Sequence, residues 1–203
     1  KGYSTQLAAL DLIGLYLADL LGTVSPAEYG EILTELQRLP DKMRQYLTDY
    51  AGAQYFASRY FNHDSIFFIG RNLDYALGLE GSLKLKEISY IHSEAYASGE
   101  LKHGTISLIE DGTLVVALGT YGKLFAKAMS NVVEVKSRGA SVLALTTYPH
   151  QEEMARTADV VMTIPDIHLF LPLTGQAVHR GLELLLHFRK GGLGHRLLAH
   201  GAL

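Results

Sequence analysis

The 203-residue sequence contains no cysteine. This absence excludes disulfides, thiolate nucleophiles and zinc–thiolate sites, and it is compatible with a reducing cytoplasm, where we expect the protein to work. No run of about 18 uncharged apolar residues occurs, so we expect no transmembrane helix. Basic residues are not in excess either, because 18 Lys and Arg stand against 21 Asp and Glu. We therefore expect neither nucleic acid nor a membrane surface as a partner.

Apolar material is plentiful, since 48% of the residues are hydrophobic and only 19% are charged. This composition argues against disorder and provides for one buried core. Short apolar runs alternate with helical segments after residue 64, which predicts an α/β fold with a parallel sheet and helices on both faces. A mixed α+β domain is the alternative. The predicted strands are Ser65–Gly70, Thr113–Leu118, Ser141–Thr146 and Val160–Ile164, and the predicted helices are Leu73–His92, Lys123–Arg138 and Gln151–Thr157.

The first 45 residues have a different, helical pattern. Leucines recur at helical spacing over Leu7–Leu21, and Gly22 marks the end of that amphipathic helix. Ser25 is placed as the N-cap of a second helix, which Pro40 is expected to break before a further helix follows. We therefore predict a helical lead-in ahead of the α/β domain.

Three charged residues stand out in the helix predicted over Leu73–His92. Glu80, Lys84 and Glu87 are spaced i, i+4 and i+7, so they lie in one line along the helix. That line is expected inside an apolar arc, where charges are costly unless they pair or meet a ligand. Two readings stay open: a buried Glu–Lys–Glu network at a helix contact, or an active-site face with perturbed pKa values. The residues assigned to the arc are Leu73, Leu77, Leu83, Ile88 and Ile91, with Tyr75, Ser82, Lys86 and Ser89 opposite.

A polar segment from His92 to Gly104 follows this helix and is dense in titratable groups. We expect it to be an irregular connector, and long connectors inside compact domains are often functional. His103 is the best candidate there for a general acid or base, because histidine titrates near neutrality. The alternative is an exposed surface histidine without a catalytic role.

The run LEGSLKLKEISYIH at Leu79–His92, continued by GELKHG at Gly99–Gly104, resembles the glutamine–fructose-6-phosphate aminotransferases, also called glucosamine-6-phosphate synthases. The similarity falls in the second of their two sugar isomerase (SIS) subdomains, and weaker similarity runs from Lys1 to about Pro172. It implies a flavodoxin-like parallel sheet flanked by helices. It also implies a division into residues 1–45 (end of a preceding SIS subdomain and linker), 46–190 (SIS domain) and 191–203 (divergent C-terminal tail).

The same resemblance implies a reaction and its residues. The family isomerises fructose 6-phosphate and aminates it with ammonia from glutamine to give glucosamine 6-phosphate. Glu87 matches the glutamate that moves a proton between C1 and C2, and Lys84 matches a lysine of the same site. His103 matches a histidine implicated in ring opening, which reaches the neighbouring subunit's site, so a homodimer is expected. We expect a buried Glu87 with a raised pKa that Lys84 keeps ionised, and only a pairing role for Glu80. No cofactor and no metal is expected.

Some features of the family are missing. No Ser-x-Ser-x-Thr phosphate loop occurs, and the nearest polar cluster is Thr146–Tyr148. No lysine follows Lys190 to form a Schiff base with the sugar. Because the chain begins at Lys1, it reads as a piece of a longer protein, expected to be inactive alone. Four histidines near the C-terminus form no metal motif and are interpreted as surface residues; they are His179, His187, His195 and His200.

Three functions are therefore weighed. The first is half of the isomerase module of an aminotransferase. The second is a non-catalytic SIS-type module that binds a sugar phosphate for sensing or regulation. The third is a stand-alone phosphosugar isomerase or deglycase, against which the missing phosphate loop counts. The line of charges at Glu80, Lys84 and Glu87 separates the first from the second, because a module that only binds has little need of a carboxylate directed at C1 and C2.

Overall fold

The computed structural model describes residues 2–46, 48, 51–60, 62–63 and 65–164. Its centre is a five-stranded sheet in the order β2-β1-β3-β4-β5, and every neighbouring pair is parallel. The predicted α/β class is confirmed, and the mixed α+β alternative is wrong. The strands are β1 (Ser65–Gly70), β2 (His92–Ala97), β3 (Leu114–Gly119), β4 (Ser141–Thr147) and β5 (Val160–Ile164).

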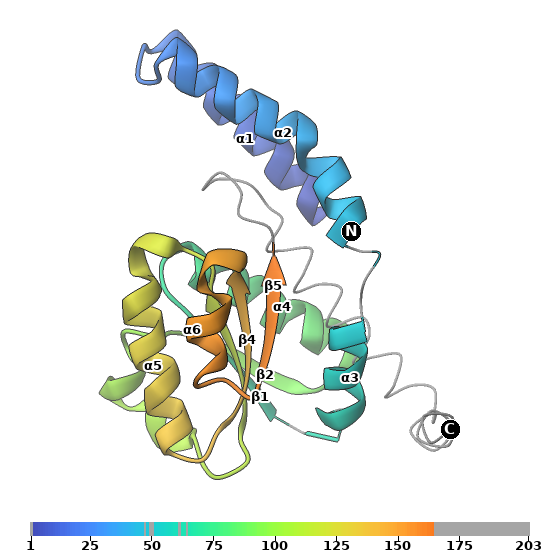
Figure 1. The fold of residues 1–203 in the computed structure, drawn as a ribbon, viewed down its shortest axis with the longest axis vertical. Helices are drawn as coiled ribbons and strands as arrows, with labels where there is room; N and C mark the ends of the chain where they lie inside the picture. The colour runs from blue at the N-terminus through green and yellow to red at the C-terminus, as the bar shows by residue number, and fades with distance from the viewer. Residues whose placement is uncertain (1, 47, 49–50, 61, 64, 165–203) are drawn as a thin grey trace.

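Helices cover both faces of this sheet, and each face has its own apolar core (Figure 1). On one face, α3 (Ala51–Tyr60) and α4 (Leu73–Ser89) pack against alternate residues such as Phe68. On the other, α5 (Phe125–Ser137) and α6 (Gln151–Ala155) pack against the intervening residues such as Val115. Strands buried on both faces explain the nearly continuous apolar runs in the sequence. Short 3₁₀ segments lie at η1 (Leu101–His103), η2 (Thr105–Leu108), η3 (Gly122–Leu124) and η4 (Tyr148–His150).

The edge strand β2 was not predicted, and the expectation of an irregular connector from His92 to Gly104 is wrong. The strand pairs with β1 in parallel from His92 opposite Ser65 to Ala97 opposite Gly70. Its pattern alternates because the small residues Ser93 and Ala95 face α4, while polar residues occupy the positions between them. Helix α4 correspondingly ends at Ser89, three residues before the predicted end.

The N-terminal helices α1 (Tyr3–Leu20) and α2 (Pro26–Tyr46) lie side by side as a rod that extends away from the α/β layers (Figure 1). The predicted end of the first helix and the predicted start of the second are both confirmed. Gly22, just after α1, has a φ of 65°, and Ser25 Oγ accepts the Glu28 N–H at 3.2 Å at the start of α2. The predicted break at Pro40 is wrong, because α2 continues to Tyr46. An ion pair of 2.5 Å between Glu35 and Lys42 spans the proline.

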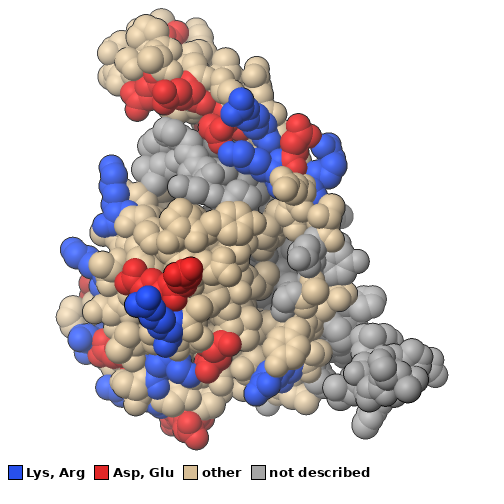
Figure 2. All heavy atoms as spheres, viewed as in Figure 1, with Lys and Arg blue, Asp and Glu red and all other residues tan. Residues whose placement is uncertain are grey.

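No helix among these described residues is long and apolar enough to span a membrane. On the face in Figure 2, acidic and basic side chains are interspersed, as the small net charge leads one to expect. The predicted tail, Lys190 and the four C-terminal histidines lie outside the described residues. The predicted boundaries at residues 45 and 190 remain predictions.

One strained residue joins β1 to α4. Asn72 has φ 55° and ψ −119°, a conformation open to glycine but costly for a residue with a Cβ, and its side chain makes no capping hydrogen bond. We expect Asn72→Gly to raise the free energy of unfolding by about 1 kcal/mol, measured by chemical denaturation. Ala76→Gly, at an exposed position inside α4, is the control and is expected to lower it by about 1 kcal/mol. If both variants had a lower free energy of unfolding than the unsubstituted chain, the assignment of strain to Asn72 would be contradicted.

Candidate functional site

Helix α4 turns a different face to the sheet from the one predicted. The buried residues are mainly small, and Leu73, Leu79 and Leu83 are 41%, 47% and 44% exposed. Small residues allow the helix to approach the sheet closely: a Cβ on Gly78 would lie 3.5 Å from Cβ of Phe68. The predicted apolar arc is therefore wrong for Leu73 and Leu83, although Leu77 and Ile91 do pack in the core. The residues of α4 that are buried are Asp74, Gly78, Gly81, Ser82, Leu85 and Ser89.

The three charged residues lie on the outward side of α4 and form one network centred on Lys84. Its Nζ is 2.8 Å from Glu87 Oε2 and 3.5 Å from Glu80 Oε1, so the predicted pairing of Glu80 is confirmed. The Lys84 side chain is 18% exposed, whereas that of Glu87 is 51% exposed. The hydrogen bond from Lys84 lowers the pKa of Glu87, and the same bond raises the pKa of Lys84. The expected raised pKa of a buried Glu87 is therefore wrong: this carboxylate is half-exposed and ionised.

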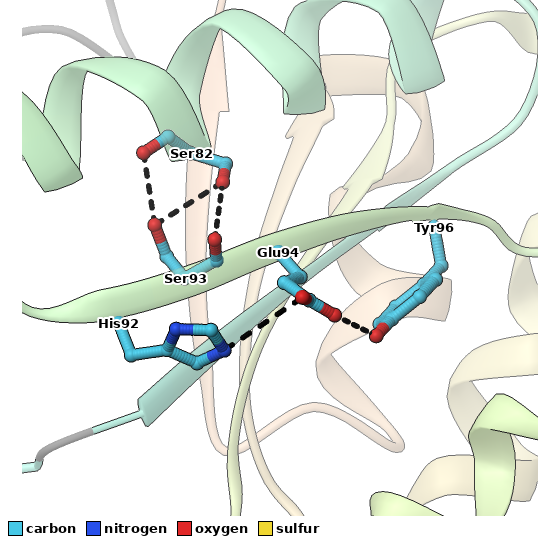
Figure 3. Close-up of polar contacts among 5 residues, drawn as sticks. All are labelled: Ser82, His92, Ser93, Glu94 and Tyr96. Carbon is cyan, nitrogen blue, oxygen red and sulfur yellow. Dashed lines mark hydrogen bonds and ion pairs between the residues drawn. The ribbon is translucent and has the colours of Figure 1, made fainter.

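A buried pair of serines fixes α4 against β2 (Figure 3). Ser82 Oγ donates to the Ser93 carbonyl at 2.8 Å, and Ser93 Oγ donates to the Ser82 carbonyl at 2.8 Å. The two hydroxyls are 3.1 Å apart, and the residues are 2% and 0% exposed. Since Ser82 is two residues before Lys84, this serine pair sets where the charged network lies along the strand.

Removing the first hydroxyl of the serine pair should lower the free energy of unfolding by more than removing the other hydroxyl afterwards. We expect Ser82→Ala to lower the free energy of unfolding by about 1–2 kcal/mol, because it removes the buried hydrogen bond to the Ser93 carbonyl and the contact between the two hydroxyls. The double variant with Ser93→Ala should lose less than the sum of the singles by about 0.5–1 kcal/mol, as measured in a double-mutant cycle. Ser137→Ala, which removes an exposed serine–backbone bond, is the control. Strictly additive losses would contradict coupling across the pair.

A second polar cluster lies on β2 at the alternate positions His92, Glu94 and Tyr96 (Figure 3). The Tyr96 hydroxyl donates to Glu94 Oε2, and His92 Nε2 is 3.8 Å from Glu94 Oε1. Burial, and then the bond to Glu94, raise the pKa of Tyr96 to about 12. The Tyr96 ring packs against Phe67 of the α5 side at 5.8 Å, so this cluster and the Lys84 network lie on opposite faces of the sheet.

His103 is the last residue of η1, and its side chain is 73% exposed. Its Nδ1 is 2.7 Å from Glu100 Oε2, and the buried Leu101 anchors the turn. Gly104, with φ 148° and ψ −51°, then takes a backbone conformation that disfavours other residues. His103 is thus held in place by its neighbours while its ring is open to a partner.

The structure does not bring His103 and Glu87 together within one chain. Helix α4 runs antiparallel to β2, because Gly78 lies over Ala95 and Ser82 lies over Ser93. Glu87 therefore lies towards the amino end of β2, whereas His103 follows its carboxyl end. A six-residue strand of about 17 Å separates the two ends.

Sequence reasoning missed one set of polar residues at the carboxyl edge of the sheet. Asp74, in the first turn of α4, accepts hydrogen bonds from Thr120 and Tyr121, which follow β3. The only signal was an acidic residue near a helix start, which is common on exposed helices. In the polar cluster at Thr146–Tyr148, the Thr146 hydroxyl has a structural role: it donates a hydrogen bond to the Gly119 carbonyl at 2.7 Å. In the described part of the chain, no group of three or more His, Asp or Glu could hold a metal ion.

Comparison with known proteins supports the predicted family. The SIS domain model matches residues 59–168. A glutamine–fructose-6-phosphate aminotransferase (isomerizing) of Caldanaerobacter subterraneus subsp. tengcongensis is 51% identical over 166 residues, which is 82% of this chain and 27% of the relative. The enzyme of the same name from Symbiobacterium thermophilum is 49% identical over 171 residues, 84% of this chain and 28% of the relative.

A solved structure agrees with both comparisons. The C-terminal domain of glucosamine-fructose-6-phosphate aminotransferase from Francisella tularensis superposes with a TM-score of 0.83 at 30% identity, covering 92% of this chain and 52% of that one. The fold and these matches define a sugar isomerase type of α/β domain, and the chain belongs to the SIS domain family. Within that family it is homologous to the C-terminal SIS part of the glutamine–fructose-6-phosphate aminotransferases, as the sequence predicted. The chain spans little more than a quarter of the length of these curated relatives.

Proposed function

We propose that this chain is the second half of the isomerase module of a glutamine–fructose-6-phosphate aminotransferase. In that role it would take part in converting fructose 6-phosphate and glutamine to glucosamine 6-phosphate, in the cytoplasm. The observation that carries the proposal is the Glu87 carboxylate, held at 2.8 Å by the Lys84 ammonium on the outward face of α4. It lies within the sequence run that resembles the aminotransferases.

Glu87 suits the proton transfer of a ketose–aldose isomerisation. An ionised carboxylate can take a proton from C1 of the open-chain sugar and return it to C2, so that no net proton is consumed. Lys84 keeps that carboxylate ionised and fixes its orientation. A neighbouring surface must exclude water from the site, and the exposed Leu83, one helical turn before Glu87, provides an apolar contact for such a surface.

We further propose that the working unit is a homodimer in which His103 of one subunit serves the site that contains Glu87 of the other. Glu87 and His103 lie near opposite ends of β2, and the His103 ring is exposed. A single chain therefore offers a base and a separate ring-opening acid, each directed outward. Two copies, or a copy and the rest of the longer protein, could bring them together around one sugar phosphate.

A chimera tests the proposed function. The aligned residues of this chain replace the matching segment of the Caldanaerobacter relative, and formation of glucosamine 6-phosphate from fructose 6-phosphate and glutamine is measured. We expect the chimera to be active and the 203-residue chain alone to be inactive. Product from the chain alone would overturn the assignment to half of a module. An inactive but folded chimera that still binds fructose 6-phosphate would instead favour a binding or regulatory module.

The Lys84–Glu87 pair also predicts a pH effect in the chimera. Because Lys84 lowers the pKa of Glu87, Lys84→Met should let that pKa rise toward the ordinary glutamate value. The carboxylate would then be protonated at a higher pH, so the acid limb of the profile of kcat against pH should move upward. The limb's position separates this effect from a general fall in kcat. An unmoved acid limb would show that Glu87 is not the group titrating there.

A further inference from the structure

The crevice between β1 and β3 is where the strand order reverses, since the chain moves from β1 outward to β2 and returns to β3. At such switch points, the carboxyl ends of parallel strands and the loops that follow them form the usual ligand crevice of α/β sheets. The loop after β1 here leads into α4, and the loop after β3 carries Thr120 and Tyr121.

Three donors of the β3 loop converge on one carboxylate in this crevice. The Thr120 N–H donates to Asp74 Oδ2 at 3.0 Å, and the Tyr121 N–H donates to the same oxygen at 3.3 Å. The Thr120 hydroxyl donates to Asp74 Oδ1 at 2.5 Å. Two consecutive backbone N–H groups and a hydroxyl are the donor set with which loops hold phosphate and other oxyanions.

The carboxylate in this position is enclosed and has no cationic partner among the residues that the structure describes. Asp74 is 2% exposed, and burial raises its pKa although the three hydrogen bonds act in the opposite direction. Arg71, the nearest cation along the chain, is directed elsewhere: its Nε donates to Asn131 Oδ1 of α5 at 3.0 Å. Among side chains and backbone groups that hydrogen-bond to Asp74, the described donors all come from the loop after β3.

We propose that Asp74 fills an oxyanion cradle with the chain's own carboxylate, so that this crevice is closed to phosphate groups until that carboxylate is removed. The cradle is built from the Thr120 and Tyr121 amides and the Thr120 hydroxyl. The Asp74 carboxylate occupies this cradle, so the phosphate of any sugar phosphate that the protein binds is held outside the crevice. The same carboxylate joins α4 to the loop after β3 across the switch point.

Removal of the carboxylate should open the cradle to inorganic phosphate. The test compares the thermal midpoint of the 203-residue chain, of Asp74→Ala and of Glu152→Ala, each in potassium phosphate and in potassium chloride of equal ionic strength. Glu152→Ala removes the same charge from an exposed position on α6. We expect phosphate at about ten times its Kd to raise the midpoint of Asp74→Ala by about 3 °C, and not to raise the other two.

Two results would overturn the proposal. One is a phosphate-dependent rise in Asp74→Ala no larger than in Glu152→Ala, which would show that the vacated donors do not hold an anion. The other is measured on the unsubstituted chain and does not depend on the variant's folding: the amide NMR signals of Thr120 and Tyr121 should stay fixed as phosphate is added. A saturable shift of both signals would show that the cradle is already open.

Discussion

Glu87→Gln should lower kcat for glucosamine 6-phosphate formation by the chimera about 10²- to 10⁴-fold, with little change in KM. Glutamine keeps the size of the side chain but cannot take a proton from carbon at neutral pH. Substrate should still bind, because a base that acts only on the reacting carbons contributes mainly to the transition state. The direct measurement is loss of exchange between the sugar's C1 or C2 hydrogen and deuterated solvent.

The matched control for this substitution is Glu152→Gln, the same chemical change on the far side of the sheet. It should leave both kcat and solvent exchange unchanged. If Glu87→Gln weakened fructose 6-phosphate binding while exchange at saturating substrate stayed normal, Glu87 would be a binding residue and the assigned base would be wrong. A non-catalytic module would show no exchange in either protein.

The fold was largely predictable because four of the five strands have apolar sequences, and β1, β3 and β4 are buried along almost their whole length. Runs such as Ser65–Gly70 and Val160–Ile164 are short, apolar and rich in β-branched or aromatic residues, and the structure has strands with the same bounds. β2 escaped prediction for the opposite reason. As an edge strand next to a closely packed helix, it carries small residues inward and polar residues outward, and such a pattern resembles a loop.

The residues of the charged network could be predicted from the sequence, but their exposure to solvent could not. The spacing of Glu80, Lys84 and Glu87 placed them correctly in one network. Their exposure was misjudged, because α4 buries glycine and serine and leaves leucines outside. Helix α4 packs closely on the sheet through its small residues and carries exposed leucines on another side, and periodicity alone does not tell which side faces the core.

Asp74 was not predictable from the sequence, because its role depends on contacts with residues 46 and 47 positions later. The local sequence does not distinguish an acidic residue that accepts hydrogen bonds from a distant loop from one that only complements a helix dipole. Long-range hydrogen bonds of this kind are fixed by topology, here by the parallel pairing of β1 with β3. The same topology separates Glu87 from His103.

That separation, together with the homodimer proposed above, predicts complementation between two inactive chimeras. Glu87→Gln and His103→Asn should each be inactive as homodimers. After the two are mixed in equal amounts and allowed to exchange subunits, about half of the dimers should be mixed, and each mixed dimer should have one site with both native residues. The mixture should therefore regain about a quarter of the unsubstituted activity.

The control is a mixture of Glu87→Gln with the double variant that carries His103→Asn as well, which should regain nothing because no site in it has both native residues. The alternative geometry gives a different outcome in the first mixture. If Glu87 and His103 acted in the site of one and the same subunit, every site of the mixed dimer would keep one defect and activity would not return. Subunit exchange must be verified by mass spectrometry of the mixed dimer, since absence of recovery then contradicts a site shared between two copies.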